Sequence, residues 1–173
     1  MSELISAIDY SVDFKQLAKD TKLVLDKYPF NNHNQICFQN TVGVEADPYQ
    51  GTGDSRLDHC PMYGLEESDF TEFNPEFNGT VFEEIFKTFP HNMGRMRLMK
   101  VPAKKCYWMH NDPGMVRYHF AVDTNENCFI LYRDHKHFHI PGDGVCYEMN
   151  TDEYHTAVNA SREDRVHLVI SGI

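Results

Sequence analysis

Residues 94–173 carry strand patterns only, and this run constrains the fold more than any other feature of the sequence. Short alternating or β-branched segments are separated by turn sequences rich in Asn, Asp, Gly and Pro. We expect eight strands, over 95–101, 106–110, 117–123, 128–133, 137–140, 145–149, 154–158 and 165–170. Eight short strands at this spacing predict a mainly β fold in which two sheets close into a double-stranded β-helix, or jelly roll.

The first half of the chain carries two helix patterns. Apolar residues recur at helical spacing in the first of them: Phe14, Leu17, Ala18, Thr21, Val24, Leu25 and Tyr28. Ser11 or Asp13 can cap this helix, and a proline stops it. The second helix is expected to begin at Thr80, because Thr80 and Glu83 have capping-box spacing. We expect both helices to pack on one sheet.

Between the helices lies a long segment, 31–79, with a short strand candidate at 35–39. A loop of this length in a compact domain is usually either functional or disordered. We favour a lid or one wall of a pocket over a purely structural loop. By length the chain is expected to be one domain, 1–173, with a helical and loop part over about 1–93 and a jelly-roll core over about 94–173.

The charge, the apolar runs and the cysteines of the chain exclude several classes of function. The net charge is −10, from 26 acidic and 16 basic residues, so binding to nucleic acid or an anionic membrane is not expected. No signal peptide is visible, and the longest aliphatic run, Leu168–Ile170, is too short to span a bilayer. Five cysteines without a CxxC pair are typical of free thiols in a reducing compartment. We expect a cytoplasmic protein, and the sequence does not indicate its oligomeric state.

Four residues carry the chemistry: His110, Asp112, His155 and Arg165. Two imidazoles and a carboxylate on one face of a metal leave the other positions open, as in non-haem Fe(II) oxygenases. Arg165 lies ten residues after the second histidine, and its planar guanidinium can bind one carboxylate of a dicarboxylate co-substrate through two hydrogen bonds. Either histidine alone would more often be an ordinary packed or surface residue. The four together, on or beside predicted strands, favour a metal site.

Strand alternation suggests further pocket residues. Cys106, Trp108 and His110 should share one strand face, and Arg117 and His119 should share a face of the next strand. His167 should lie on the same face as the arginine two residues before it. Cys106, Trp108 and His167 are therefore substrate-pocket candidates, while a buried structural pair is the alternative for the Arg-x-His strand.

At these residues the sequence resembles the 2-oxoglutarate/Fe(II)-dependent oxygenase superfamily, in the aspartyl/asparaginyl β-hydroxylase-like branch that includes proline hydroxylase-like enzymes. The resemblance covers roughly 95–170, through the strand pair 94–110, the Arg-x-His strand 117–120, and the ending 155–168. It implies that His110, Asp112 and His155 are the iron ligands and that Arg165 grips the distal carboxylate of 2-oxoglutarate. Arg117 and His119 would assist in binding co-substrate or substrate.

The resemblance departs from the branch at one position. Vertebrate aspartyl/asparaginyl β-hydroxylases carry glycine where this chain has Asp112, so the full triad is more similar to the proline-hydroxylase side. The implied reaction uses Fe(II), 2-oxoglutarate and O2 to hydroxylate an unactivated C–H bond, with release of succinate and CO2. The substrate would be a small molecule or an amino-acid or peptide side chain, and desaturation or ring closure stays open.

Other interpretations are weighed against this one. The alternate histidines of 133–139 could form a zinc site, but we interpret them as a polar hairpin on the outside of the barrel. A non-catalytic cupin-like module that binds a metal or ligand, or a structural jelly roll, would have the same strand pattern.

Overall fold

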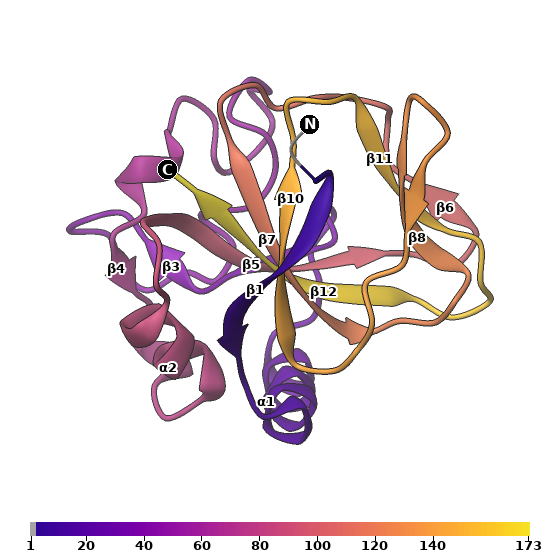
Figure 1. The fold of residues 1–173 in the computed structure, drawn as a ribbon. Coiled ribbons are helices and arrows are strands. Elements are labelled where there is room, and N and C mark those ends of the chain that lie inside the picture. Colours follow the sequence, from indigo (N-terminus) through magenta and orange to yellow (C-terminus); the bar gives the residue numbers. More distant parts are fainter. Residues whose placement is uncertain (1–2) are drawn as a thin grey trace.

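The computed structural model describes residues 3–173 and arranges most of its strands in two antiparallel sheets (Figure 1). The larger sheet has the order β1–β10–β7–β12–β5–β2 and the smaller β6–β11–β8–β9, while β3 and β4 form a separate pair. The strands are β1 Ile5–Ser11, β2 Gln35–Cys37, β3 Gln39–Asn40, β4 Glu72–Phe73, β5 Met93–Val101, β6 Lys105–Cys106, β7 Val116–Asp123, β8 Cys128–Tyr132, β9 His137–Phe138, β10 Val145–Asn150, β11 His155–Asn159 and β12 Arg165–Gly172. The predicted mainly β jelly roll with two helices is confirmed.

The helices are α1 (Phe14–Lys27) and α2 (Val81–Thr88), and both pack on one face of the larger sheet (Figure 1). On that face Leu168 stands opposite Leu98 and Phe120, and these side chains join Leu17 and Phe82 of the helices in the main core. The apolar face of β12 thus packs on the helices and not on the smaller sheet. Because the helices cover the outside, the inner face of the sheet is free to carry polar residues.

Both helices begin near the predicted residues, but one cap differs. Asp13 caps α1, because its Oδ1 accepts from the backbone of Gln16 at 3.0 Å. The capping box predicted at Thr80 is absent, since the Thr80 hydroxyl donates to a preceding carbonyl. The Val81 amide donates instead to Asp20 of α1, at 2.8 Å. A hydrogen bond between the two helices thus replaces the predicted local cap. Sequence spacing cannot reveal such a contact, because its two residues are far apart in the chain.

The strand expected over 106–110 is the main departure from the predicted sheet. Cys106 pairs with Val158 and His110 pairs with His155, so this segment advances four residues while β11 advances three. One extra residue on one side of an antiparallel pair is a β-bulge, which breaks the alternation of faces. Trp108 therefore turns outward and is 91% exposed. Strands β1 and β4 were not expected either.

The long segment before α2 folds against the open edge of the barrel. It contains β3, β4 and two short 3₁₀ helices, η1 (Glu67–Asp69) and η2 (Pro75–Phe77). A small apolar cluster of Cys37, Met62 and Phe70 attaches it to β2. Within residues 3–173 there is no helix that combines the length and the apolar character needed to cross a membrane.

Candidate active site

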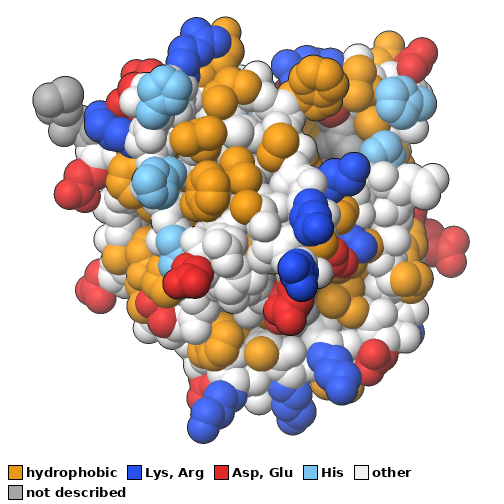
Figure 2. All heavy atoms as spheres, turned by 90° about the vertical axis from the view of Figure 1, so that its right-hand side faces the viewer, with side chains coloured by type: hydrophobic (Ala, Val, Ile, Leu, Met, Phe, Trp, Pro, Cys, Tyr) orange, Lys and Arg blue, Asp and Glu red, His pale blue; other side chains and the backbone are white. Residues whose placement is uncertain are grey.

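A cavity of about 770 Å³ lies between the two sheets. Its lining comes from the inner faces of β5, β7 and β12, from β11, from the bulged segment 107–115, and from 53–67 of the long segment. The expected wall of a pocket is therefore present. The face shown in Figure 2 has a hollow bordered by hydrophobic and histidine side chains, with cationic side chains nearby.

His110 and His155 face one another in this cavity. Their backbones exchange two hydrogen bonds, of 3.0 and 2.8 Å, and their ring centroids are 4.6 Å apart. Each Nδ1 donates to a backbone carbonyl two residues earlier, that of Trp108 at 2.7 Å and that of Glu153 at 2.8 Å. Each Nε2 therefore keeps its lone pair, which is how a ligating histidine is commonly held. Burial lowers the pKa of His155, which favours the neutral imidazole that a metal requires.

Asp112 lies two residues beyond the first histidine, at the end of the bulged segment. Its amide donates to the Thr151 carbonyl at 2.8 Å, and its Oδ2 lies 3.2 Å from Nη2 of Arg117. Within residues 3–173 no three His, Cys, Asp or Glu side chains are arranged as a metal site. In this conformation the carboxylate is engaged by Arg117. Two imidazoles and one nearby carboxylate still fit the donor set of a non-haem iron site.

Arg165 is 3% exposed and lacks an anionic partner among residues 3–173. Its Nη2 donates to Nδ1 of His167 at 3.0 Å, and its Nε has no hydrogen-bond partner within the described chain. Burial lowers the pKa of Arg165 to about 10. Burial and the charge of Arg165 also hold the pKa of His167 well below its usual value. A buried guanidinium without a carboxylate is costly, so this position favours an anionic ligand.

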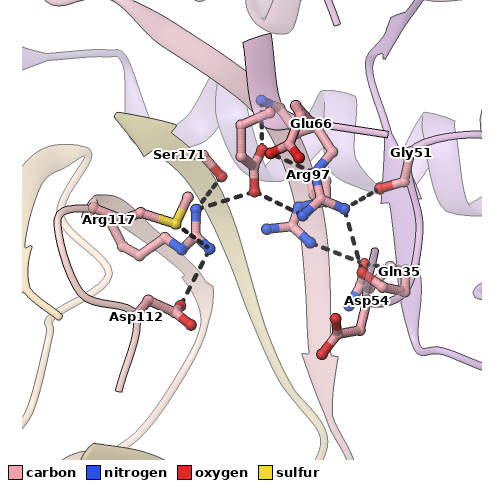
Figure 3. A network of polar contacts seen from close by, with 12 residues as sticks. Gln35, Gly51, Asp54, Glu66, Arg97, Asp112, Arg117 and Ser171 are labelled. Carbon is pink, nitrogen blue, oxygen red and sulfur yellow. Dashed lines mark hydrogen bonds and ion pairs between the residues drawn. The ribbon is translucent and has the colours of Figure 1, made fainter. Parts of the chain in front are cut away.

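Arg117 and His119 both line the cavity, as expected from their shared strand face. Arg117 donates to Ser171 and contacts the Asp112 carboxylate (Figure 3). It also lies 3.3 Å from the Glu67 carboxylate. His119 is buried, and its Nδ1 has no partner in the described chain. Burial, then the charge of Arg165, holds the pKa of His119 well below its usual value. The ring is therefore neutral at pH 7.

The remaining pocket candidates are placed differently. Trp108 lies at the cavity margin with its ring in solvent, and Cys106 is exposed and outside the lining, because the bulge separates both from the face of His110. His167 contacts Arg165 through a hydrogen bond but does not itself line the cavity. The histidines of 133–139 belong to the β8–β9 hairpin, and His137 is exposed there, as expected.

Sequence reasoning missed an ionic network at one end of the cavity. Glu67 of η1 accepts from Nη2 and Nε of Arg95, at 2.7 and 2.9 Å, and lies 3.3 Å from Arg117. Burial alone would raise the pKa of Glu67, but the Arg95 hydrogen bonds and the neighbouring guanidinium charges hold it well below its usual range. Arg97 lies on the same strand face as Arg95. The available signal was Arg95-x-Arg97 in an otherwise apolar strand.

The part of the chain that contains these residues also identifies the protein family. Residues 62–173 match the family model described as Aspartyl/Asparaginyl beta-hydroxylase. The chain belongs to the aspartyl/asparaginyl beta-hydroxylase family. No curated protein matches the sequence significantly. Membership in this family supports an oxygenase or hydroxylase activity.

Two solved structures resemble this family member over 99% of its length. A nickel complex of the non-heme monooxygenase ThoJ is 11% identical, is covered over 74% of its chain and gives a TM-score of 0.54. The viral collagen prolyl hydroxylase vCPH from Paramecium Bursaria Chlorella virus-1, as its 2OG complex, is 7% identical, is covered over 97% and gives 0.52. At these identities the likeness concerns the fold.

A third match is more local. The plu4264 protein from Photorhabdus luminescens is 15% identical, with 46% of this chain and 62% of that chain covered and a TM-score of 0.37. The hydroxylase-family chain thus spans less than two thirds of that protein.

Replacing Glu67 by alanine in this family member is expected to lower the free energy of unfolding by about 3–5 kcal/mol, because it leaves the buried Arg95 charge without a partner. Urea unfolding measures the change. The matched control is Glu76→Ala, which removes a solvent-exposed ion pair with Lys27 and should have a much smaller effect. Equal losses in the two variants would show that the buried pair has no special weight.

Proposed function

We propose that this chain is an Fe(II)- and 2-oxoglutarate-dependent dioxygenase. It would hydroxylate an unactivated C–H bond of a small molecule or of an amino-acid or peptide side chain, and release succinate and CO2. One observation carries the proposal: the His110–His155 pair, with both Nε2 lone pairs free, shares a cavity with the unpaired Arg165 guanidinium. A metal and a dicarboxylate are the ligands that these groups suit.

In this proposal His110, Asp112 and His155 hold the iron. The backbone bridge between the two histidines fixes their spacing, and the carbonyls behind each ring fix the tautomer. Bound iron would supply the oxygen-activating chemistry that no side chain provides. Arg117 now holds the Asp112 carboxylate, and metal binding would draw that carboxylate from it. The Arg117 guanidinium would then be freer to contact an anionic ligand.

Arg165 binds the carboxylate of 2-oxoglutarate that lies away from the metal. Its free Nε and its burial favour a charge-assisted contact in a low-dielectric setting. His167 accepts from Nη2 and so orients the guanidinium. His119, neutral and without a partner at Nδ1, is placed to assist co-substrate binding. Residues 53–67 form one wall of the cavity, and a bound substrate would complete the exclusion of water.

The proposal is tested by release of succinate. Purified protein with Fe(II), ascorbate and 2-oxoglutarate is incubated with free amino acids, proline included, and with short peptides. We expect stoichiometric metal binding, metal-dependent binding of 2-oxoglutarate, and succinate release that at least one candidate substrate stimulates. A cupin-like binding module would bind metal or ligand without succinate release. A structural jelly roll would bind neither, and either result would contradict the proposal.

A further inference from the structure

Three buried arginines line the cavity, Arg95, Arg97 and Arg165, and Arg97 takes no part in the proposed function. Arg97 of β5 is 4% exposed, and no ion pair joins it to a carboxylate among residues 3–173. Its Nη1 donates to the amide oxygen of Gln35 at 3.2 Å, and its Nε has no partner in the described chain. Figure 3 shows it beside Gln35 in the network. Burial, and then the charge of Arg95, lowers the pKa of Arg97 to about 9.

No carboxylate among residues 3–173 forms a hydrogen bond or ion pair with Arg97. The charge of Glu67 acts on Arg97, but Glu67 makes its short hydrogen bonds with Arg95. The Gln35 oxygen is neutral and also accepts from the backbone of Gly53, at 3.1 Å. A buried guanidinium with an unsatisfied Nε is destabilising unless an anion binds beside it. Arg97 is therefore, besides Arg165, a second arginine of the cavity without a carboxylate partner among residues 3–173.

Arg97 and Arg165 are separate anion positions. Arg97 stands opposite Val169 of β12, four residues along that strand from Arg165, which corresponds to roughly 13 Å at the usual rise per residue. The hydrogen-bond partners also differ: Nη1 of Arg97 donates to Gln35, whereas Nη2 of Arg165 donates to His167. In the proposed function one carboxylate of 2-oxoglutarate is at the metal and the other is at Arg165. The co-substrate then leaves Arg97 free.

Resting on that proposed function, we infer that Arg97 binds a carboxylate of the substrate. The substrate is a carboxylic acid, either a small free acid such as an amino acid or the acidic side chain of a peptide. Met62 and Met99 line the same cavity, so an apolar part of the substrate fits beside the charged end. Arg97 is thus the specificity-determining contact that selects acids over their neutral amides.

The test compares acids with amides in the Ni(II)-loaded protein with 2-oxoglutarate, by calorimetry and thermal shift. The probes are the free amino acids and their carboxamides, together with capped Gly-Asp-Gly and Gly-Asn-Gly peptides. We expect at least one acid to bind at least about 10-fold more tightly than its amide. Preference for free amino acids or for the Asp peptide identifies the source of the carboxylate.

Arg97→Gln should weaken binding of the preferred acid at least about 30-fold and leave binding of the amide unchanged. Its affinity for 2-oxoglutarate should stay within about threefold of the wild-type value. Arg97→Lys should restore part of the acid preference. Arg162→Gln, which removes an exposed arginine, is the matched control for loss of charge and should keep the preference. The ligand-free Arg97→Gln protein should be at least as stable as wild type, which a purely structural arginine would not allow.

Three results would overturn the inference. Either no acid binds, or acids and amides bind equally, or Arg97→Gln lowers the affinity for 2-oxoglutarate as strongly as Arg165→Met does. The acid and amide comparison in the wild-type protein does not depend on how any variant folds. Repeating it without metal and 2-oxoglutarate separates the two proposals. Acid selectivity without any binding of metal or 2-oxoglutarate would contradict the oxygenase and retain the Arg97 site.

Discussion

Replacement of His155 by alanine is expected to abolish stoichiometric binding of Fe(II), and with it the metal-dependent binding of 2-oxoglutarate. His155 contributes one of two imidazoles whose Nε2 atoms are free, and an alanine has no donor to replace it. We expect the affinity for metal to fall by more than about 100-fold, since loss of groups that merely orient a ligand already costs 10- to 100-fold. Anaerobic titration followed by elemental analysis measures the metal, and calorimetry measures 2-oxoglutarate.

The fold should survive this change. The bridge between His155 and His110 consists of backbone hydrogen bonds, which alanine retains. His139→Ala is the matched control, because its Nδ1 also contacts a backbone carbonyl, that of Cys128 at 2.8 Å, and it does not line the cavity. This control should bind metal normally. Full metal binding by His155→Ala, or equal losses in both variants, would remove His155 from the proposed site.

Replacement of Arg165 by methionine is expected to have two effects of opposite sign. Affinity for 2-oxoglutarate should fall at least about 30-fold, because loss of one partner of a buried charge pair costs about 2–5 kcal/mol. The ligand-free protein should become more stable by on the order of 1–3 kcal/mol, because the change removes a buried charge without an anionic partner. The stability gain is limited, because His167 loses the donor to its Nδ1. Metal binding should not change.

Calorimetry with the metal-loaded protein and urea unfolding of the ligand-free protein measure the two effects. Arg162→Met removes an exposed arginine and should leave both quantities near their wild-type values. Tight 2-oxoglutarate binding by Arg165→Met would exclude Arg165 as the carboxylate contact. A loss of stability in the ligand-free variant would show instead that Arg165 serves to hold the barrel together.

Much of the fold could be predicted because its determinants are local. Alternation and turn residues gave seven of the eight expected barrel strands in nearly the observed places. Helical spacing predicted α1 and α2, and Asp13 caps α1 through a contact three residues along the chain. The cap of α2 was mispredicted, because Asp20 reaches Val81 from another helix. Contacts between residues far apart in sequence leave no such periodic signal.

In the candidate site, too, some features could be predicted from the sequence and others depend on the tertiary structure. The sequence by itself singled out His110, Asp112, His155 and Arg165 as candidates, because residue type and spacing are visible without a fold. Only the tertiary structure placed the Trp108 ring in solvent at the cavity margin, through one extra residue in an antiparallel pair. Only it showed that, among residues 3–173, Arg95 has a carboxylate partner and Arg97 has none, since Glu67 lies in the long segment that folds against Arg95. Pairing and burial are properties of neighbours in space, and these decide which charges are left for a ligand.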